Sequence, residues 1–133
     1  MPNRSRVMLI DDDREMLVSL GAVLERLGCS VTMFSDPGEA LDAFEAGETE
    51  LVLTDLSMPG MSRLDVLRAV RGRDPGAAVA LVTGSVDGEW RNEAEREGVF
   101  RILKKPINIS MLNEILKELH SGKDCIVHAC REV

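Results

Sequence analysis

The sequence predicts a doubly wound α/β fold, in which one parallel sheet carries helices on both faces. Short apolar runs, typical of strands buried on both sides, alternate five times with stretches whose apolar residues recur at helical spacing. The links are short, so right-handed crossovers should return each strand parallel to its neighbours. Polar residues interrupt the apolar runs at their carboxyl ends, which is the edge where such sheets bind ligands.

The first unit is a strand over residues 7–10 followed by a helix that ends at Gly28. Asp12 or Asp13 can cap this helix, because a carboxylate accepts hydrogen bonds from the free amides of the first turn. The apolar stripe of the helix consists of Leu17, Leu20, Val23, Leu24 and Leu27.

The second strand covers residues 31–34. The dipeptide at 36–37, Asp-Pro, opens a helix that we expect Gly47 to end. The third strand covers residues 51–54 and leads into a loop around the Pro-Gly dipeptide at 59–60.

Ser62 with Asp65 resembles a capping box and predicts the start of the third helix. The apolar residues of this helix are Leu64, Val66, Leu67 and Val70. The fourth strand follows at residues 79–82.

The fourth helix is the weakest prediction, because the stretch from Asp87 to Glu97 is polar apart from Trp90 and Ala94. Asp87 is its candidate cap. The fifth strand covers residues 99–103. A final amphipathic helix follows Pro106 and is marked by Ile109, Leu112, Ile115, Leu116 and Leu119.

Composition and charge exclude several functional classes. The 133 residues fit one domain, and 44% hydrophobic with 29% charged residues is a globular balance. The net charge of −7 argues against nucleic acid as a direct partner, because phosphate binding needs a basic face. The first apolar run is too short for a signal sequence or a membrane span. Three scattered cysteines, Cys29, Cys125 and Cys130, fit reduced thiols. We therefore expect a cytoplasmic protein without a membrane partner.

Acidic, hydroxyl and basic residues follow the strands at one edge of the predicted sheet. Asp11 and Asp12 end the first strand and Asp55 ends the third, while Thr83 ends the fourth and Lys105 follows the fifth. Three converging carboxylates repel one another unless a cation is present. A few carboxylates together with water suit Mg²⁺, so the sequence predicts a magnesium site.

This set of residues suits phosphoryl transfer to a carboxylate. With the metal in place Asp55 is a plausible nucleophile toward phosphorus. Such a transfer needs in-line positioning and neutralisation of the phosphoryl oxygens. Mg²⁺, the Lys105 ammonium and the Thr83 hydroxyl can each serve one of those oxygens.

At this point the sequence resembles a known family, the response-regulator receiver domains of bacterial two-component systems. The resemblance covers roughly residues 5–121 and rests on four segments in the right order, each ending a predicted strand. They are Val-Met-Leu-Ile-Asp-Asp-Asp at 7–13, Leu-Val-Leu-Thr-Asp-Leu-Ser-Met-Pro-Gly-Met at 51–61, Leu-Val-Thr-Gly at 81–84 and Lys-Lys-Pro at 104–106.

The resemblance implies the role of each site residue. Asp55 is the phosphoacceptor, Thr83 the switch hydroxyl and Lys105 the phosphoryl-binding lysine. The metal ligands are Asp11, Asp12, Asp55 and the backbone carbonyl of Ser57. It also implies a flavodoxin-like strand order 2-1-3-4-5, and a protein that catalyses only its own phosphorylation and dephosphorylation.

The resemblance extends to partners and domain limits. A sensor histidine kinase or a histidine phosphotransfer protein is the expected phosphodonor. The face made by the fourth helix, fifth strand and fifth helix is expected to change its affinity for an output partner or effector domain. A receiver domain over 1–121 would then be followed by a tail or linker over 122–133.

The sequence departs from the family pattern at a few positions. Ile102 stands where most relatives carry Tyr or Phe, the aromatic partner of the switch hydroxyl. Ser62-Arg63 replaces the usual Asp-Gly. Ser57 and Ser85 occupy positions that tune the lifetime of the phosphoryl group in the family.

Alternative interpretations remain open at this stage. The acids at 11–13 could simply cap a helix, and Thr83 could bond the backbone at a strand end. Asp11 and Asp13 also superficially fit the Asp-x-Asp pattern of haloacid-dehalogenase-like phosphatases, although the cap and longer core of that class would be hard to fit into 133 residues. A receiver-like interaction module that is never phosphorylated is the third hypothesis.

Overall fold

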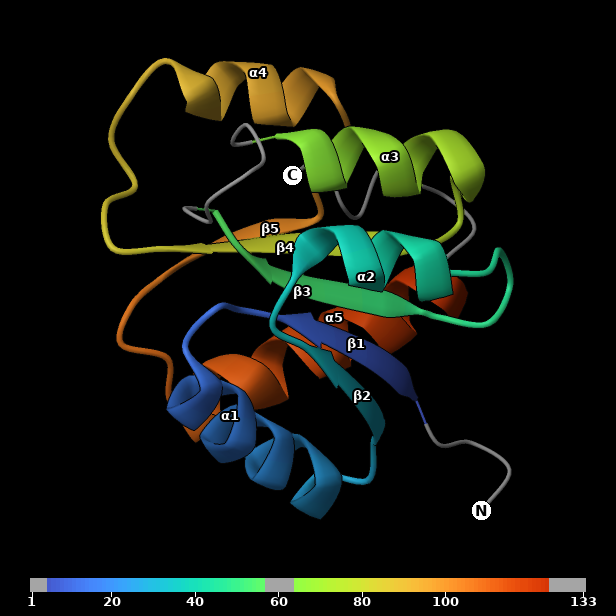
Figure 1. Ribbon diagram of the computed structural model, residues 1–133, viewed down its shortest axis with the longest axis vertical. Coiled ribbons are helices and arrows are strands. Elements are labelled where there is room, and N and C mark those ends of the chain that lie inside the picture. The colour runs from blue at the N-terminus through green and yellow to red at the C-terminus, as the bar shows by residue number, and fades with distance from the viewer. Residues whose placement is uncertain (1–4, 57–63, 125–133) are drawn as a thin grey trace.

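The computed structural model describes residues 5–56 and 64–124 and confirms the predicted fold class. Five parallel strands form one sheet in the order β2-β1-β3-β4-β5, the predicted flavodoxin-like order (Figure 1). The strands are β1 (Arg6–Ile10), β2 (Ser30–Phe34), β3 (Leu51–Asp55), β4 (Ala78–Thr83) and β5 (Arg101–Lys104). The helices are α1 (Arg14–Arg26), α2 (Pro37–Ala43), α3 (Asp65–Arg73), α4 (Trp90–Arg96) and α5 (Ile109–Asp124).

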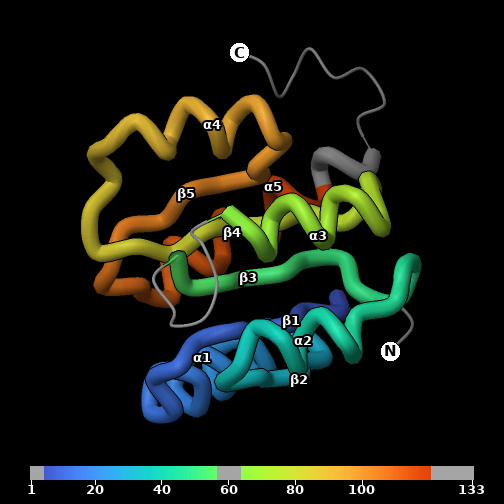
Figure 2. Tube along the Cα trace, turned by 45° about the horizontal axis from the view of Figure 1, so that its top comes forward, coloured from blue at the N-terminus to red at the C-terminus, as the bar shows by residue number. Residues whose placement is uncertain are grey.

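Helices cover the sheet on both faces, as Figure 1 and Figure 2 show. Alternate strand residues point to opposite faces, so each face receives its own apolar set. One core joins α1 and α5 to the sheet through Leu9, Leu24, Leu53, Val82 and Leu112. The other joins α2, α3 and α4 to it through Ile10, Ala40, Leu67, Leu81 and Ala94. The central strands β1 and β3 are therefore buried on both sides.

Strand register brings the predicted site residues to one edge. Ile10 lies beside Thr54, Asp55 beside Val82, and Thr83 beside Lys104. Because the strands are parallel, all four carboxyl ends open in the same direction. The side chains that follow these strands must meet there.

The second and third helices differ from the sequence prediction. α2 ends at Ala43 rather than at Gly47, because Phe44 turns to an extended backbone (φ −71°, ψ 129°) and buries its ring in the core. α3 begins at Asp65 with Leu64 at its N-cap, whereas the sequence predicted its start at Ser62. Ser62 and the Pro-Gly loop at 59–60 lie outside the described residues.

Two later predictions are also corrected. α4 begins at Trp90 with Glu89 at its N-cap and no side-chain cap bond, so Asp87 is not the cap. Ile109, expected on the buried stripe of the last helix, is 55% exposed, whereas the other four residues of that stripe are buried. Trp90 and Ala94 do supply the apolar contacts of α4.

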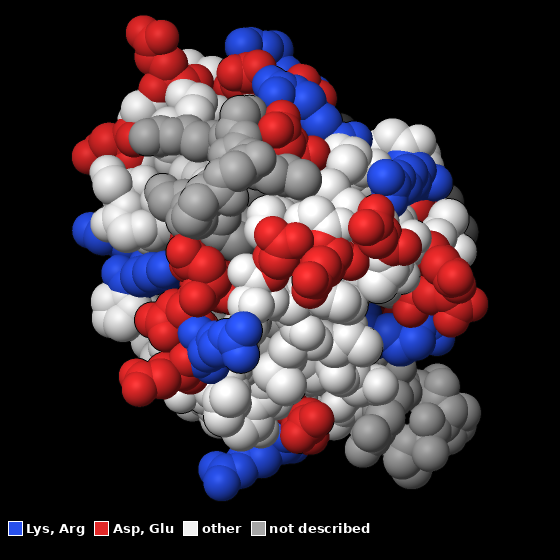
Figure 3. Space-filling model, in the orientation of Figure 1, with Lys and Arg blue, Asp and Glu red and all other residues white. Residues whose placement is uncertain are grey.

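The surface agrees with the acidic composition. Figure 3 shows Asp and Glu side chains gathered over the region of α2 near the centre of the view. Among the helices of the described residues, none has the length and apolar character needed to cross a membrane.

Candidate functional site

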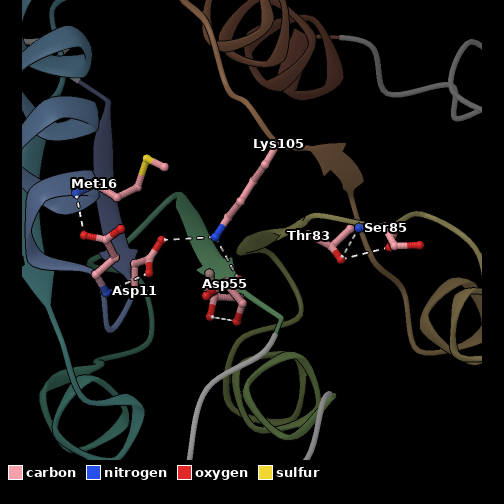
Figure 4. Close-up of polar contacts among 8 residues, drawn as sticks. Asp11, Met16, Asp55, Thr83, Ser85 and Lys105 are labelled. Atoms are coloured by element: carbon pink, nitrogen blue, oxygen red, sulfur yellow. Dashed lines mark hydrogen bonds and ion pairs between the residues drawn. The ribbon is translucent and has the colours of Figure 1, made fainter.

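Four strand ends position the candidate site (Figure 4). Asp55 and Thr83 are the last residues of β3 and β4, while Asp11 and Lys105 directly follow β1 and β5. Two backbone bonds extend the ladders past the strand ends. The Asp11 N–H donates to the Phe34 carbonyl at 3.1 Å, and the Lys105 N–H donates to the Thr83 carbonyl at 2.8 Å. These bonds hold the backbone of both residues at the edge of the sheet.

The three predicted metal-side carboxylates lie together. One oxygen from each of Asp11, Asp12 and Asp55 falls within 4.8 Å of the other two. Asp11 and Asp55 are buried, and Asp12 is exposed. Carboxylate oxygens at this separation, with one side open to water, fit a hard divalent cation. Ser57, the fourth predicted ligand, lies outside the described residues.

Lys105 points into this acidic cluster. Its Nζ lies 3.5 Å from Asp55 Oδ1 and 3.9 Å from Asp11 Oδ2 (Figure 4). One ammonium among three carboxylates leaves an excess of negative charge. The cluster can therefore accept further positive charge, and the ammonium lies beside Asp55 Oδ1.

Burial raises the pKa of the Asp11 carboxyl above its ordinary value. The N–H of Asp13 donates to Asp11 Oδ1 at 2.9 Å and opposes this shift. The negative charge of Asp55 raises the pKa of Asp11 further, and the Lys105 ammonium lowers it. Burial and a neighbouring carboxylate both disfavour the charged form of Asp11, and a bound cation would favour it.

The Thr83 hydroxyl is engaged with the β4–α4 loop. It donates to the Ser85 carbonyl at 2.9 Å and accepts from the Ser85 N–H at 3.1 Å (Figure 4). The alternative interpretation, a threonine that bonds the backbone at a strand end, is thus correct for this state of the molecule. A threonine that binds a ligand near Asp55 would have to give up these bonds.

The three acids at 11–13 have different positions and contacts. The Asp13 side chain accepts from the N–H groups of Glu15 and Met16, so Asp13 is the N-cap of α1. Asp11 and Asp12 remain for the cluster. Sequence alone left the cap open between Asp12 and Asp13, because either spacing allows it.

One polar arrangement between the β4–α4 loop and α4 went unpredicted. The indole Nε1–H of Trp90 donates to the Asp87 carbonyl at 3.1 Å. The sequence signal was Gly88, a glycine two residues before the single tryptophan. Ile102 is half-buried and packs against the same core as Trp90.

Comparison with known proteins shows the family to which the chain is similar. The family model of the response regulator receiver domain matches residues 7–117. The C4-dicarboxylate transport transcriptional regulatory protein DctD of Rhizobium meliloti is 35% identical over 100 residues, which cover 75% of this chain and 22% of DctD. A response regulator receiver protein of Anaeromyxobacter is 30% identical over 110 residues, covering 83% of this chain and 46% of that protein.

A solved structure is also similar. The receiver domain protein of Clostridium thermocellum has a TM-score of 0.84 at 30% identity, covering 90% of this chain and 97% of that one. The chain spans less than half the length of the two curated relatives named above. The matched region holds the acidic cluster and every strand residue except Arg6, and the chain belongs to the response regulator receiver domain family of two-component signal transduction.

Proposed function

We propose that this receiver domain is a phosphorylation switch in which Asp55 accepts a phosphoryl group in the presence of Mg²⁺. The observation that carries the proposal is the position of Asp55. Its carboxylate lies with Asp11 and Asp12 within 4.8 Å, and the Lys105 ammonium is 3.5 Å from its Oδ1. In the proposed assignment the metal ligands are these three acids and the backbone carbonyl of Ser57.

The chemistry is a transfer between two nucleophiles. An Asp55 carboxylate oxygen attacks phosphorus, an O–P bond forms, and the P–N bond of a phosphohistidine donor breaks. The imidazole nitrogen of the donor keeps the electron pair and takes up a proton. Bound Mg²⁺ would supply positive charge toward the phosphoryl oxygens. Lys105 neutralises another oxygen, and Thr83 donates its hydroxyl once it leaves Ser85.

The phosphodonor and the output follow from this chemistry. A sensor histidine kinase or a histidine phosphotransfer protein supplies phosphohistidine, in the cytoplasm. Phosphorylation biases two states of the face formed by α4, β5 and α5, and this changes affinity for an output partner or effector domain. We assign the receiver domain to residues 1–121 and a tail or linker to 122–133. The domain acts on no substrate other than its own phosphoryl group.

Two other functions have less support. For a haloacid-dehalogenase-like phosphatase, the Asp-x-Asp pattern would need Asp13 in the chemistry, but its carboxylate caps α1. For an interaction module without phosphorylation, the acidic cluster and Lys105 would have no use. Ile102, in place of an aromatic residue, is the single feature in its favour.

Intact-mass spectrometry after incubation with acetyl phosphate tests the proposal. We expect one phosphoryl adduct in Mg²⁺ and none in EDTA. Asp55→Asn should abolish it. Asp42→Asn, which alters an exposed acid on α2, should leave it unchanged.

Two further variants test the proposed roles of Asp11 and Lys105 separately. Asp11→Asn should raise the Mg²⁺ concentration needed for adduct formation, and Lys105→Met should slow adduct formation while leaving Mg²⁺ binding in place. An adduct that persists in Asp55→Asn would reject Asp55 as the acceptor. No adduct with acetyl phosphate or with a phosphorylated histidine kinase would favour the unphosphorylated module.

A further inference from the structure

We propose that the Asp87-Gly88 pair is a site of spontaneous backbone rearrangement, at which a cyclic imide forms and reopens to isoaspartate. The pair lies in the loop between β4 and α4, which Figure 1 and Figure 2 show at the outer edge of the molecule. The reaction uses no enzyme, metal or phosphodonor, so the inference stands apart from the function proposed above.

The chemistry is an attack by a backbone amide on the preceding side chain. The Gly88 nitrogen bonds to Asp87 Cγ and loses its proton, and a C–O bond of the carboxyl group breaks with release of water. The ring that closes consists of the Gly88 nitrogen with Cγ, Cβ, Cα and the carbonyl carbon of Asp87. Water then adds to a ring carbonyl. Addition at the carbonyl carbon of Asp87 breaks its bond to nitrogen, and the main chain then runs through Cβ and Cγ.

Both reacting groups are exposed and available. Asp87 and Gly88 are each open to solvent. Among the described residues, none makes a hydrogen bond or an ion pair with the Asp87 carboxylate, and the Gly88 N–H donates to none of them. The bonds that Asp87 does make, to Ser85 and Trp90, use its backbone N–H and carbonyl. The attack of the amide on the carboxyl group therefore breaks no hydrogen bond of either reacting group.

The fold requires glycine at the attacking position. Gly88 has φ +131°, a conformation that favours glycine. A Cβ at this position would lie 2.7 Å from Trp90 Cδ1 and 2.8 Å from its Nε1. The absence of a side chain also leaves the Gly88 nitrogen unshielded toward the Asp87 carboxyl carbon. Packing of the indole thus keeps in place the residue that makes the pair reactive.

The other aspartates that the structure describes lack this combination of features. The chain has a single Asp-Gly pair and no Asn-Gly pair. Asp36 and Asp74 precede prolines, which have no N–H. Asp42 lies inside α2, where the helix ladder engages the backbone N–H groups, and Asp55 is buried. We therefore expect the rearrangement at position 87 and at no other described aspartate.

Isoaspartate at position 87 would change the connection between β4 and α4. The main chain gains one carbon atom, and the former carbonyl oxygen of Asp87 becomes part of a free carboxylate. That oxygen is the acceptor of the Trp90 indole N–H at 3.1 Å. Arg91 Nη1 donates to the Val86 carbonyl at 3.3 Å and so spans the rearranged bond. The rearrangement therefore alters two contacts that hold the first turn of α4.

Labelling with heavy oxygen tests the reaction on the intact chain. The native protein is kept for several weeks at pH 7 in water labelled with heavy oxygen, and is then digested in ordinary water for peptide sequencing by mass spectrometry. Because ring opening consumes one water molecule, we expect one heavy oxygen at position 87. Asp42, in the same digest, should carry none. No label at position 87 of the native protein would overturn the inference.

Two controls separate ring formation from other routes of exchange. Asp87→Glu keeps the charge, but its longer side chain would have to close a larger ring, so the label should be lost. The wild type in urea should be labelled at position 87, because the unfolded chain permits the same ring. Label in urea but not in the native protein would show that the fold blocks the attack, and equal label in Asp87→Glu would show exchange without a ring. Either result would overturn the inference.

A second readout identifies the product. A carboxyl methyltransferase specific for isoaspartate transfers the methyl group of S-adenosylmethionine to the free carboxylate, and the sulfonium leaves as a thioether. Stored wild-type protein should accept methyl groups at position 87, and stored Asp87→Glu should accept none. Emission of Trp90, the single tryptophan, should shift in the methylated sample only. Heavy oxygen without methylation would show that the ring reopens to aspartate alone and would overturn isoaspartate as the product.

Discussion

Replacing Asp11 by asparagine should stabilise the metal-free protein. Asp11 is 5% exposed, and its charge is only partly compensated. At an effective dielectric constant of about 20, repulsion from Asp55 across at most 4.8 Å is at least about 3.5 kcal/mol. Attraction to Lys105 at 3.9 Å is about 4 kcal/mol. The repulsion and the attraction nearly cancel. The cost of burying the carboxylate therefore decides whether Asp11→Asn stabilises or destabilises the protein.

The stability gained by Asp11→Asn is reduced because the hydrogen bond from the Asp13 N–H becomes weaker. Asparagine Oδ1 can still accept the Asp13 N–H, now held at 2.9 Å, but a neutral acceptor gives up about 1 kcal/mol. Effective burial penalties for an ion are several kcal/mol. We therefore expect Asp11→Asn to raise the free energy of unfolding by roughly 1–2 kcal/mol at pH 7.

The pH dependence gives a second check. Because the pKa of Asp11 is raised above its ordinary value of 3.8, the native state binds the proton more tightly than the unfolded chain does. The destabilisation caused by the Asp11 charge is absent below the ordinary pKa. It grows as the pH rises from the ordinary to the raised pKa, and it is complete above the raised pKa. The advantage of Asp11→Asn should shrink as the pH falls from 7 toward 4.

Urea unfolding in EDTA, followed by circular dichroism, measures both effects. Asp12→Asn, which alters an exposed acid of the same cluster, should give a smaller gain. Saturating Mg²⁺ should stabilise the wild type by about 2.7 kcal/mol at 100 times its dissociation constant, and Asp11→Asn by less. A destabilised Asp11→Asn protein at pH 7, or a gain that does not change with pH, would refute the electrostatic reasoning.

Three further predictions concern the fold. Leu81→Ala, at a fully buried position in the middle of β4, should lower the free energy of unfolding by roughly 2–5 kcal/mol in urea titrations. Val18→Ala, at a position that is 65% exposed, should change the free energy of unfolding little. Gly98→Ala should destabilise by roughly 1–2 kcal/mol in the same assay, because Gly98, which follows the C-cap of α4, has φ +91°. Arg68 of α3 pairs with Glu93 of α4 and with Glu97, the C-cap of α4. Arg68→Ala should therefore speed amide exchange in α4 at low salt and have little effect in 1 M salt, where the Debye length is about 3 Å. Equal exchange at both salt concentrations would show that these ion pairs do not hold α4.

The fold was predictable because its signals are redundant along the chain. Apolar runs, short links and polar strand ends all indicate the same parallel sheet, and the register then brings Asp11, Asp55 and Lys105 together. Element boundaries were less predictable. Phe44 leaves its helix to bury its ring, and this tertiary contact outweighs the local signal at Gly47.

Side-chain direction was the other limit. Nothing in the residue order fixes whether Thr83 bonds the loop or faces Asp55, because both are hydrogen-bonding options at one strand end. Asp87 was a plausible cap by residue type, yet its carbonyl accepts the Trp90 indole instead. The site residues followed from their positions at strand ends, but their present hydrogen bonds required the structure.

The most direct test of the central claim locates the phosphoryl group on the chain. Protein treated with acetyl phosphate and Mg²⁺ is reduced with borohydride, which converts an aspartyl phosphate to homoserine, and its peptides are then sequenced by mass spectrometry. The proposed switch predicts homoserine at position 55, with none in EDTA and none in Asp55→Asn. Homoserine at another position, or an adduct that resists borohydride, would contradict Asp55 as the phosphoacceptor.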